Sequence, residues 1–302
     1  MEIEQPEDFL KLFIRDSNYR IQNYKRILSI LSPRVIVLYC FYDIENLLLT
    51  KAGKELNIPV IEMQHGRVRN HWAYEMLSKT PEAGRSWIPG EFWLWDVPTR
   101  EYLKQIGIEK FIHLKVIGNP WIFLNVKEKN DFYDGSNLAE KISINSSEIN
   151  ILITLQGKGI PEYLKNAIRE SDDKIKWFVR VHPRYREDES CYDFLSSLSE
   201  KVVDWQLTSN APLYYLLPKM DYHITFYSVV CLEADYFGVK NLVMDPLAME
   251  SYDTGVGDYA LVQSKESILL SIQYKNSSKN KENNIVDSKF KILESIKPFF
   301  YS

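Results

Sequence analysis

The sequence predicts an α/β protein made of two halves, each a parallel β-sheet with helices on its faces. Short apolar runs rich in β-branched residues alternate with helical segments along most of the chain, which is the pattern of strand–helix–strand units. A polar stretch between residues 127 and 148 separates two such series. A chain of 302 residues is long enough for two domains, and it buries enough surface to need no disulfide or metal for stability.

The first half begins with an amphipathic helix, predicted over residues 7–31 because its apolar residues recur at helical spacing. The run 34–40 is apolar on both faces, as strands inside a parallel sheet are. Asp43 is the expected N-cap of the helix that follows. The strand candidates are 34–40, 58–63, 91–95 and 114–118, with helices between them at 43–56 and 98–106. We therefore predict a small first domain over residues 1–125 and a linker over residues 126–148.

The second half repeats the strand–helix rhythm. Its strand candidates are 150–155, 177–181, 202–205, 222–225 and 241–244; its helices are predicted after the loop 156–161 up to 170, around 191–198, and at 211–217 and 229–237. The segment 250–255 is predicted as a loop. A second domain is therefore expected over residues 149–270, with a polar loop and a C-terminal helix (288–300) in residues 271–302. Two such domains are expected to hold a ligand in the cleft between them, at the carboxyl ends of the strands.

Charge and cysteine content exclude several classes of protein. The 37 Lys and Arg residues against 41 Asp and Glu give a net charge of -4, so no nucleic-acid partner is expected. Cys40, Cys191 and Cys231 lie far apart without CxxC spacing, and HExxH is absent, so neither a disulfide framework nor a metal site is expected. No apolar stretch approaches the ~20 residues that span a bilayer, and the acidic start lacks a signal-peptide pattern, which predicts a cytoplasmic protein.

The sharpest local motif is Arg180-Val-His182-Pro183-Arg184, which directly follows a buried strand. Parallel sheets bind ligands at this end of their strands, and Pro183 fixes the turn that follows. A histidine flanked by two arginines gathers hydrogen-bond donors and favours a phosphate or diphosphate ligand. The alternative is a surface arginine pair with a histidine that only bonds a loop.

A second motif, Thr225-Phe226-Tyr227-Ser228, joins a strand to a helix that carries Glu233. Free backbone N–H groups and the helix dipole favour an anion at such a turn. Ser228 alternatively serves only as the helix cap, and Glu233 either accepts ribose hydroxyls or faces solvent.

The loop at Gly157 and Lys158 lacks the spacing of a Walker or dinucleotide motif. It is expected either to approach the ligand with its backbone or to form a flexible turn.

A third motif surrounds His65 at the end of a strand in the first half. Gly66 allows a sharp turn, so that His65 projects into the cleft as a general base. Glu62 and Asp43 are rival catalytic carboxyl groups, although Asp43 is also explained as a helix cap. The alternative for His65 is a side chain packed beneath the loop 67–72.

Taken in chain order, these motifs resemble bacterial GT-B glycosyltransferases of surface-polysaccharide synthesis. The resemblance consists of Gln64-His65-Gly66, Gly118-Asn119-Pro120, the Arg-x-His-Pro ending at Pro183 and the Thr-x-Tyr-Ser ending at Ser228. It is similar to the CDP-glycerol glycerophosphotransferases of teichoic-acid synthesis and to CMP-sialic acid and Kdo transferases. It spans roughly residues 35–255 and implies two Rossmann-like domains facing a cleft, the first of them small.

The resemblance also implies roles for individual residues. His182 and Ser228 would contact the donor phosphate, Glu233 the ribose, and His65 would act as base or orienting group on the acceptor. The donor-binding set is Arg180, His182, Pro183, Arg184, Thr225, Tyr227, Ser228, Glu233, Gly157 and Lys158, the catalytic set is His65, Asp43 and Glu62, and the acceptor side is Gln64, Gly66 and Arg67. Phe226 and Val229 stand where the glycerophosphotransferases have Asp and Ser, which favours a sugar donor.

The expected activity is metal-independent and needs no cofactor. A sugar would move from a nucleotide-activated donor, CMP-linked by preference, to a glycan or lipid-linked glycan acceptor at the cell surface. A lipid-linked acceptor would bring the chain to the inner face of the membrane as a peripheral protein. The alternatives are a CDP-polyol glycerophosphotransferase, a catalytically inactive GT-B binding subunit and a sugar-nucleotide epimerase.

Overall fold

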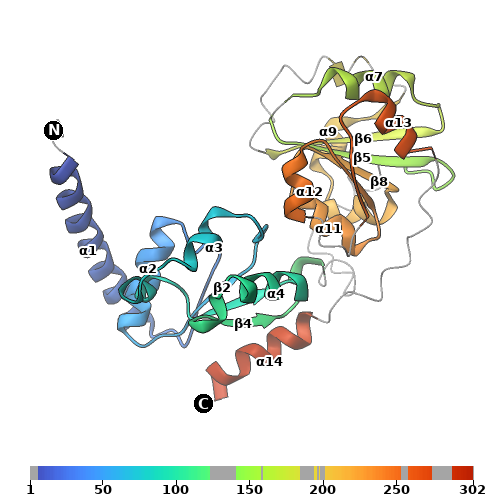
Figure 1. The fold of residues 1–302 in the computed structure, drawn as a ribbon. Coiled ribbons are helices and arrows are strands. Elements are labelled where there is room, and N and C mark those ends of the chain that lie inside the picture. The colour runs from blue at the N-terminus through green and yellow to red at the C-terminus, as the bar shows by residue number, and fades with distance from the viewer. Residues whose placement is uncertain are drawn as a thin grey trace. The chain divides into compact units, whose positions relative to one another are not determined.

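The chain forms two compact units in a computed structural model (Figure 1). The structure describes residues 6–122, 141–157, 159–183, 194–195, 197, 201–252, 258–273 and 288–301, with side chains from Leu10 onward. Unit 1 comprises Met1–Pro120 and Asp287–Ser302, and unit 2 comprises Trp121–Val286. The predicted linker lies mostly outside the described residues, so the domain boundaries stay predictions.

Unit 1 is built on a parallel four-stranded sheet in the order β1-β2-β3-β4. The strands are β1 (Ile36–Leu38), β2 (Val60–Met63), β3 (Glu91–Leu94) and β4 (His113–Val116). The helices are α1 (Pro6–Leu31), α2 (Ile44–Glu55), α3 (Trp72–Leu77), η1 (Glu82–Trp87), α4 (Val97–Gln105), η2 (Ile108–Lys110) and α14 (Ser288–Tyr301). Every strand and the three helices predicted for this half are present; α3 was not predicted.

The two faces of the unit 1 sheet are covered by segments from opposite ends of the chain. One face packs on helices of the first half, with Ile21 of α1 and Leu48 of α2 in the core. The other face, at Ile61 and Trp93, packs against Ile296 of α14. Figure 1 shows α14, in red, beside the blue and green strands of this unit. The sequence predicted α14 as a helix but not this sheet as its packing partner.

Unit 2 is a six-stranded parallel sheet in the order β10-β9-β8-β5-β6-β7. The strands are β5 (Ile149–Leu155), β6 (Ile175–Val181), β7 (Val202–Val203), β8 (Tyr222–Thr225), β9 (Lys240–Val243) and β10 (Tyr259–Leu261). The helices are α7 (Glu162–Glu170), α9 (Trp205–Asn210), α10 (Leu213–Leu216), η5 (Leu217–Lys219), α11 (Val230–Tyr236), α12 (Pro246–Tyr252) and α13 (Lys265–Ser271). Together the two parallel sheets confirm the predicted α/β class.

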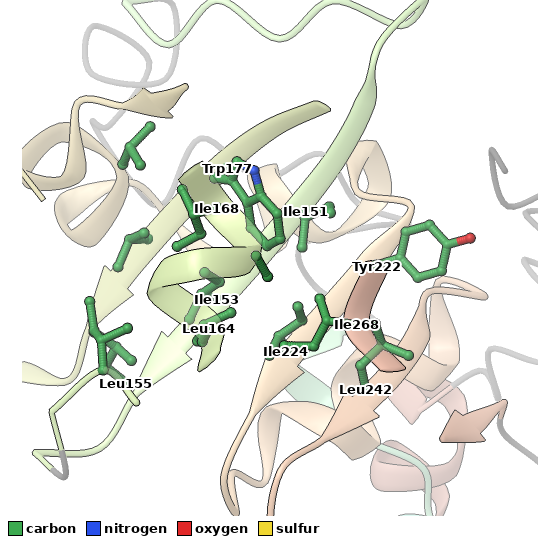
Figure 2. Packing of buried hydrophobic residues seen from close by; sticks show 14 of the residues in the cluster. Ile151, Ile153, Leu155, Leu164, Ile168, Trp177, Tyr222, Ile224, Leu242 and Ile268 are labelled. Atoms are coloured by element: carbon green, nitrogen blue, oxygen red, sulfur yellow. The ribbon is translucent and has the colours of Figure 1, made fainter. Parts of the chain in front are cut away.

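The packing around the central strand β5 explains why apolar residues do not alternate with polar ones along it. Ile151 and Ile153 point toward α7 and α13, where Leu164 packs on them (Figure 2). Leu152 points to the opposite face, against the cluster that contains Leu216 of α10. Because both faces are covered, every side chain from Asn150 to Leu155 is buried.

Two segment predictions in unit 2 are wrong. The strand predicted over 202–205 ends at Val203, because Asp204 caps α9 by accepting hydrogen bonds from the backbone N–H groups of Gln206 and Leu207. The segment 250–255, predicted as a loop, continues α12 to Tyr252. The predicted helix at 191–198 lies almost wholly outside the described residues. Among the helices that the structure describes, none has the length and apolar character needed to cross a bilayer.

Candidate functional site

His65 lies at the carboxyl edge of the unit 1 sheet, the edge at which the parallel strands end. Its Nε2 is 2.9 Å from Cys40 Sγ and 3.5 Å from Tyr42 Oη, both on the loop that follows β1. Its Nδ1 is buried, and among the described residues it has no hydrogen-bond partner. One ring nitrogen of His65 is thus held by the protein, and the other is buried without a hydrogen-bond partner among the described residues.

Burial sets the protonation of this group. It lowers the pKa of His65, so the imidazole is neutral at pH 7. It raises the pKa of the Cys40 thiol and, more strongly, that of the Tyr42 phenol, so both stay protonated. A neutral imidazole is the form that accepts a proton, and the tautomer with its proton on Nε2 leaves the Nδ1 lone pair free.

Glu62 is placed inside unit 1, where its side chain is 1% exposed. Tyr74 Oη donates a hydrogen bond of 2.8 Å to Glu62 Oε1, while Oε2 has no partner among the described residues. Burial raises the pKa of Glu62 to about 8, so its carboxyl group is protonated at neutral pH. A buried and protonated acid is a poor base, which disfavours Glu62 as the catalytic carboxyl group.

The remaining predicted residues of unit 1 hold the backbone around His65. Exposed Asp43 caps α2 by accepting a 2.9 Å hydrogen bond from the N–H of Glu45. Gln64 is buried; it donates to the carbonyl of Gly66 and accepts from the N–H of Trp95. Arg67 donates to the carbonyl of Asn70, while buried Gly66 supplies the turn.

The carboxyl edge of the unit 2 sheet carries the second group of predicted residues. His182 follows β6, and its N–H donates to the carbonyl of Leu155 at the end of the neighbouring strand β5. Its side chain is exposed, as is Pro183. Gly157 follows β5 with a φ of 75°, a conformation that favours glycine. Ser228 follows β8, on the other side of β5, so these residues flank one strand end.

Gln156 joins the loops after β5 and β8. Its Oε1 accepts a 3.1 Å hydrogen bond from the N–H of Tyr227, and its Nε2 donates to the carbonyl of the same residue at 2.5 Å. A single amide side chain therefore fixes the turn before Ser228 against the turn at Gly157. Gln156 was not among the site residues predicted from the sequence. Its position directly after a buried strand was the feature that could have indicated a role at this edge.

Several predicted donor-binding side chains are engaged within unit 2. Arg180 Nη1 donates to the carbonyls of Thr208 and Ala211 near the end of α9. Glu233 accepts a 2.7 Å hydrogen bond from Tyr214 Oη, and burial raises its pKa. Ser228, 7% exposed, accepts from the N–H of Val230 at 3.3 Å, but the N-cap of α11 is Val229 rather than the predicted Ser228.

Two further members of that set also bond within the fold. Thr225 is fully buried and donates to the carbonyl of Thr154, and Tyr227 Oη donates to Ser251 Oγ. Lys158 and Arg184 lie outside the described residues.

The structure has a further hollow and no metal-binding cluster among the described residues. A hollow of about 440 Å³ is lined by Lys104, Lys110 and His113, at the start of β4 and hence at the edge opposite to His65. Within the described part of the chain, no group of three or more His, Cys, Asp and Glu side chains is arranged to hold a metal ion.

Comparison with known proteins finds likeness in structure. No family model and no curated protein matches the sequence. The UDP-GlcNAc 2-epimerase from Neisseria meningitidis, solved with UDP-GlcNAc, is 19% identical over 99% of this chain and 84% of that one, with a TM-score of 0.63.

Two transferases match as well. A UGT transferase from Siraitia grosvenorii, in complex with UDP, is 14% identical over 95% of this chain and 84% of that one, with a TM-score of 0.54. The wall teichoic acid polymerase TagF is 14% identical over 82% of this chain and 70% of that one, with a TM-score of 0.52. At such identities the likeness establishes the fold. The predicted fold class, two parallel-sheet Rossmann-like domains of GT-B type, is confirmed.

Proposed function

We propose that this chain is a glycosyltransferase that takes a sugar from a nucleotide-activated donor and passes it to a glycan acceptor. Unit 2 would bind the donor phosphate at the ends of β5, β6 and β8, and unit 1 would act on the acceptor through His65. The observation that carries the proposal is the pair of hydrogen bonds between Gln156 and Tyr227. This pair joins the Gly157 and Ser228 turns beside His182.

The donor side rests on backbone geometry and one exposed histidine. The turn at Gly157 and the turn before α11 bring backbone N–H groups to one edge of the sheet, where anions bind well. The exposed ring of His182 adds a donor that can reach a phosphate oxygen. Arg180 donates from Nη1 to carbonyls near the end of α9 and so also supports this edge from within the fold.

The acceptor step uses His65. Its neutral imidazole takes the proton of an acceptor hydroxyl, and the hydroxyl oxygen forms a bond with the anomeric carbon of the donor sugar. The bond between that carbon and the phosphate oxygen breaks, and its electron pair leaves with the nucleotide. Donors around the phosphate stabilise the charge that develops there.

An epimerase is the second candidate, because the Neisseria meningitidis enzyme matches with a higher TM-score than either transferase. The two candidates differ in their need for an acceptor. Incubation with UDP-GlcNAc alone would invert C2 in an epimerase, whereas a transferase would release nucleotide only when an acceptor is added. Chromatography of the sugar nucleotide separates these outcomes.

The first test is nucleotide binding by calorimetry with CMP, CDP, UDP and GDP, including CDP-glycerol to test the glycerophosphotransferase alternative. The resemblance favours a CMP-linked donor, while two of the similar structures hold UDP-GlcNAc and UDP. We expect one nucleotide to bind more tightly than the others. His182→Ala is expected to lower the affinity for that nucleotide roughly tenfold, because one charge-assisted contact is lost.

The matched control is His113→Ala, another exposed histidine, on β4 of unit 1, which is expected to bind as the wild type does. If no nucleotide binds the wild type, the catalytically inactive alternative is favoured. If His182→Ala binds with full affinity, the phosphate site is assigned to the wrong residues.

A further inference from the structure

Four aromatic side chains surround His65 and continue away from it; we call Tyr39, Tyr42, His71 and Trp72 the aromatic strip. The ring centroids of Tyr39 and Tyr42 lie 6.5 and 6.3 Å from that of His65. Tyr42 is 4.9 Å from His71 and 5.6 Å from Trp72, and the last two rings stack at 5.9 Å with 25° between their planes. The strip thus connects the proposed base to Trp72 through successive ring contacts.

The two ends of the aromatic strip are exposed and its middle is half-buried. Tyr42 and His71 are half-buried, whereas Tyr39 is 50% exposed and Trp72 63% exposed. Trp72 is the first residue of α3, a helix that buries Ala73, Tyr74 and Leu77 instead. The indole is therefore not needed for the core of unit 1, and an apolar ring of this size left in water is a frequent mark of a binding surface.

The rings of the strip are held in place before any ligand arrives. His71 Nδ1 accepts a 3.4 Å hydrogen bond from the N–H of Ala73 and so caps α3 with its ring. Tyr42 is fixed between His65 and His71 by the contacts above. A rigid surface loses little conformational entropy on binding, which favours weak ligands such as single sugar rings.

The chemistry of the strip fits a pyranose ring. One face of such a ring presents C–H groups that lie well on an aromatic face, while its hydroxyl groups need polar partners at the edge. Polar groups lie next to the rings here: the half-buried imidazole of His65, and Tyr42 Oη at 3.5 Å from Nε2 of that imidazole.

We propose that the aromatic strip binds a pyranose ring of the acceptor glycan and presents one of its hydroxyl groups to His65. This inference rests on the proposed function, because it takes His65 as the base that acts on the acceptor. It makes the acceptor a carbohydrate rather than a polyol phosphate. A nucleobase would also stack on these rings, so the experiment has to separate the two.

The test is saturation-transfer NMR with methyl β-D-glucopyranoside, methyl β-D-galactopyranoside and N-acetylglucosamine, with glycerol 3-phosphate as a ligand that offers no ring. We expect the wild type to transfer saturation to the C–H groups of at least one pyranose and not to glycerol 3-phosphate. Trp72→Ala is expected to bind that sugar roughly tenfold more weakly, as the loss of one aromatic contact implies. Trp72→Phe should restore most of the affinity.

A second test variant and a control variant accompany this experiment. Tyr39→Ala removes a second exposed ring and is expected to weaken the same sugar, which keeps the test open if Trp72→Ala folds poorly. Tyr19→Ala is the matched control, because Tyr19 is an exposed aromatic residue on α1, 66% exposed and in the same unit. It should bind the sugar as the wild type does.

Three outcomes would overturn the inference: no pyranose bound by the wild type, equal binding by Trp72→Ala, or a loss of CMP or UDP affinity in Trp72→Ala. The last would make the strip a nucleobase site. Nucleotide titration of the same samples keeps the two proposals apart. If the protein binds nucleotide but no sugar, only the proposal for the aromatic strip is contradicted. If it binds sugar but no nucleotide, only the proposed donor site is contradicted.

Discussion

At the scale of single residues, Glu62 shows how burial controls a titratable group. An ordinary Glu carboxyl has a pKa of 4.5, and burial raises that of Glu62 to about 8. Between these values the folded protein keeps a proton that the unfolded chain has released, so the free energy of unfolding falls as the pH rises. The slope from this group is at most about 1.4 kcal/mol per pH unit.

The protonation of His223 changes stability with pH in the opposite sense. It therefore sets the pH range in which the effect of Glu62 on stability can be measured. Burial lowers the pKa of His223 from 6.5 to about 4, so its contribution to stability is lost as the pH falls through that interval. As the pH rises further above 6.5, the imidazole becomes neutral in the unfolded state as well, so the slope that remains toward pH 8 reports on Glu62.

Glu62→Gln is expected to remove the fall in stability between pH 6.5 and pH 8. The amide keeps the shape of the side chain and still accepts the hydrogen bond from Tyr74, but it does not titrate. Urea unfolding followed by tryptophan fluorescence at several pH values measures the slope. Glu109→Gln, at an exposed position on η2, should keep the wild-type slope. A slope that persists in Glu62→Gln would mean that Glu62 is ionised in the folded protein.

Residue patterns predicted His65 but not its surroundings. A histidine before a glycine at a strand end is visible in the sequence. The positions of Cys40 and Tyr42 are not, because Cys40 adopts a φ of 52°, which residues other than glycine rarely do. That backbone turn aims both side chains at Nε2, and only the folded loop reveals it.

At the scale of elements, the unit 2 sheet presents its site through loops held by one side chain. Gln156→Ala removes both hydrogen bonds to Tyr227, so the two turns lose their connection. We expect destabilisation of about 1–3 kcal/mol, as for two partly buried hydrogen bonds, together with several-fold weaker nucleotide binding. Thermal unfolding and calorimetry on the same variant measure the two effects.

Gln156→Glu is the sharper form of this test, since it keeps an acceptor for the N–H of Tyr227 and loses the donor to its carbonyl. It should fall between the wild type and Gln156→Ala. Gln206→Ala, at an exposed glutamine of α9, is the control and should change neither property. Full nucleotide affinity in Gln156→Ala would contradict the idea that this amide organises the donor site.

At the scale of the whole molecule, the C-terminal helix α14 packs against the sheet formed by the first half of the chain. Helix α14 closes one face of the unit 1 sheet, where Ile296 packs against the cluster of Ile61, Trp93 and Ile117. Arg34 Nη1 also donates a 3.2 Å hydrogen bond to the carbonyl of Phe299. Unit 1 is therefore complete only when both ends of the chain are in place.

Ile296→Ala is expected to lower the free energy of unfolding by about 1–2 kcal/mol, because a half-buried aliphatic side chain is removed from this contact. Leu293→Ala on the same helix should have little effect, since Leu293 is 47% exposed. Thermal unfolding compares the two variants, and nucleotide affinity should be unchanged in both. Equal destabilisation by the two substitutions would contradict the packing of α14 described above.

The sequence by itself determined the α/β class, the strands of both sheets except β10, and the carboxyl-edge positions of His65, His182 and Ser228. These follow from hydrophobic patterns and turn residues, which act over a few neighbouring positions. Packing between distant segments, by contrast, turns Arg180 toward the α9 carbonyls, makes Glu62 a protonated interior acid, and brings Gln156 to Tyr227 and Cys40 to His65. Each depends on the environment that distant segments create around a side chain, and burial and partners of that kind are set by packing.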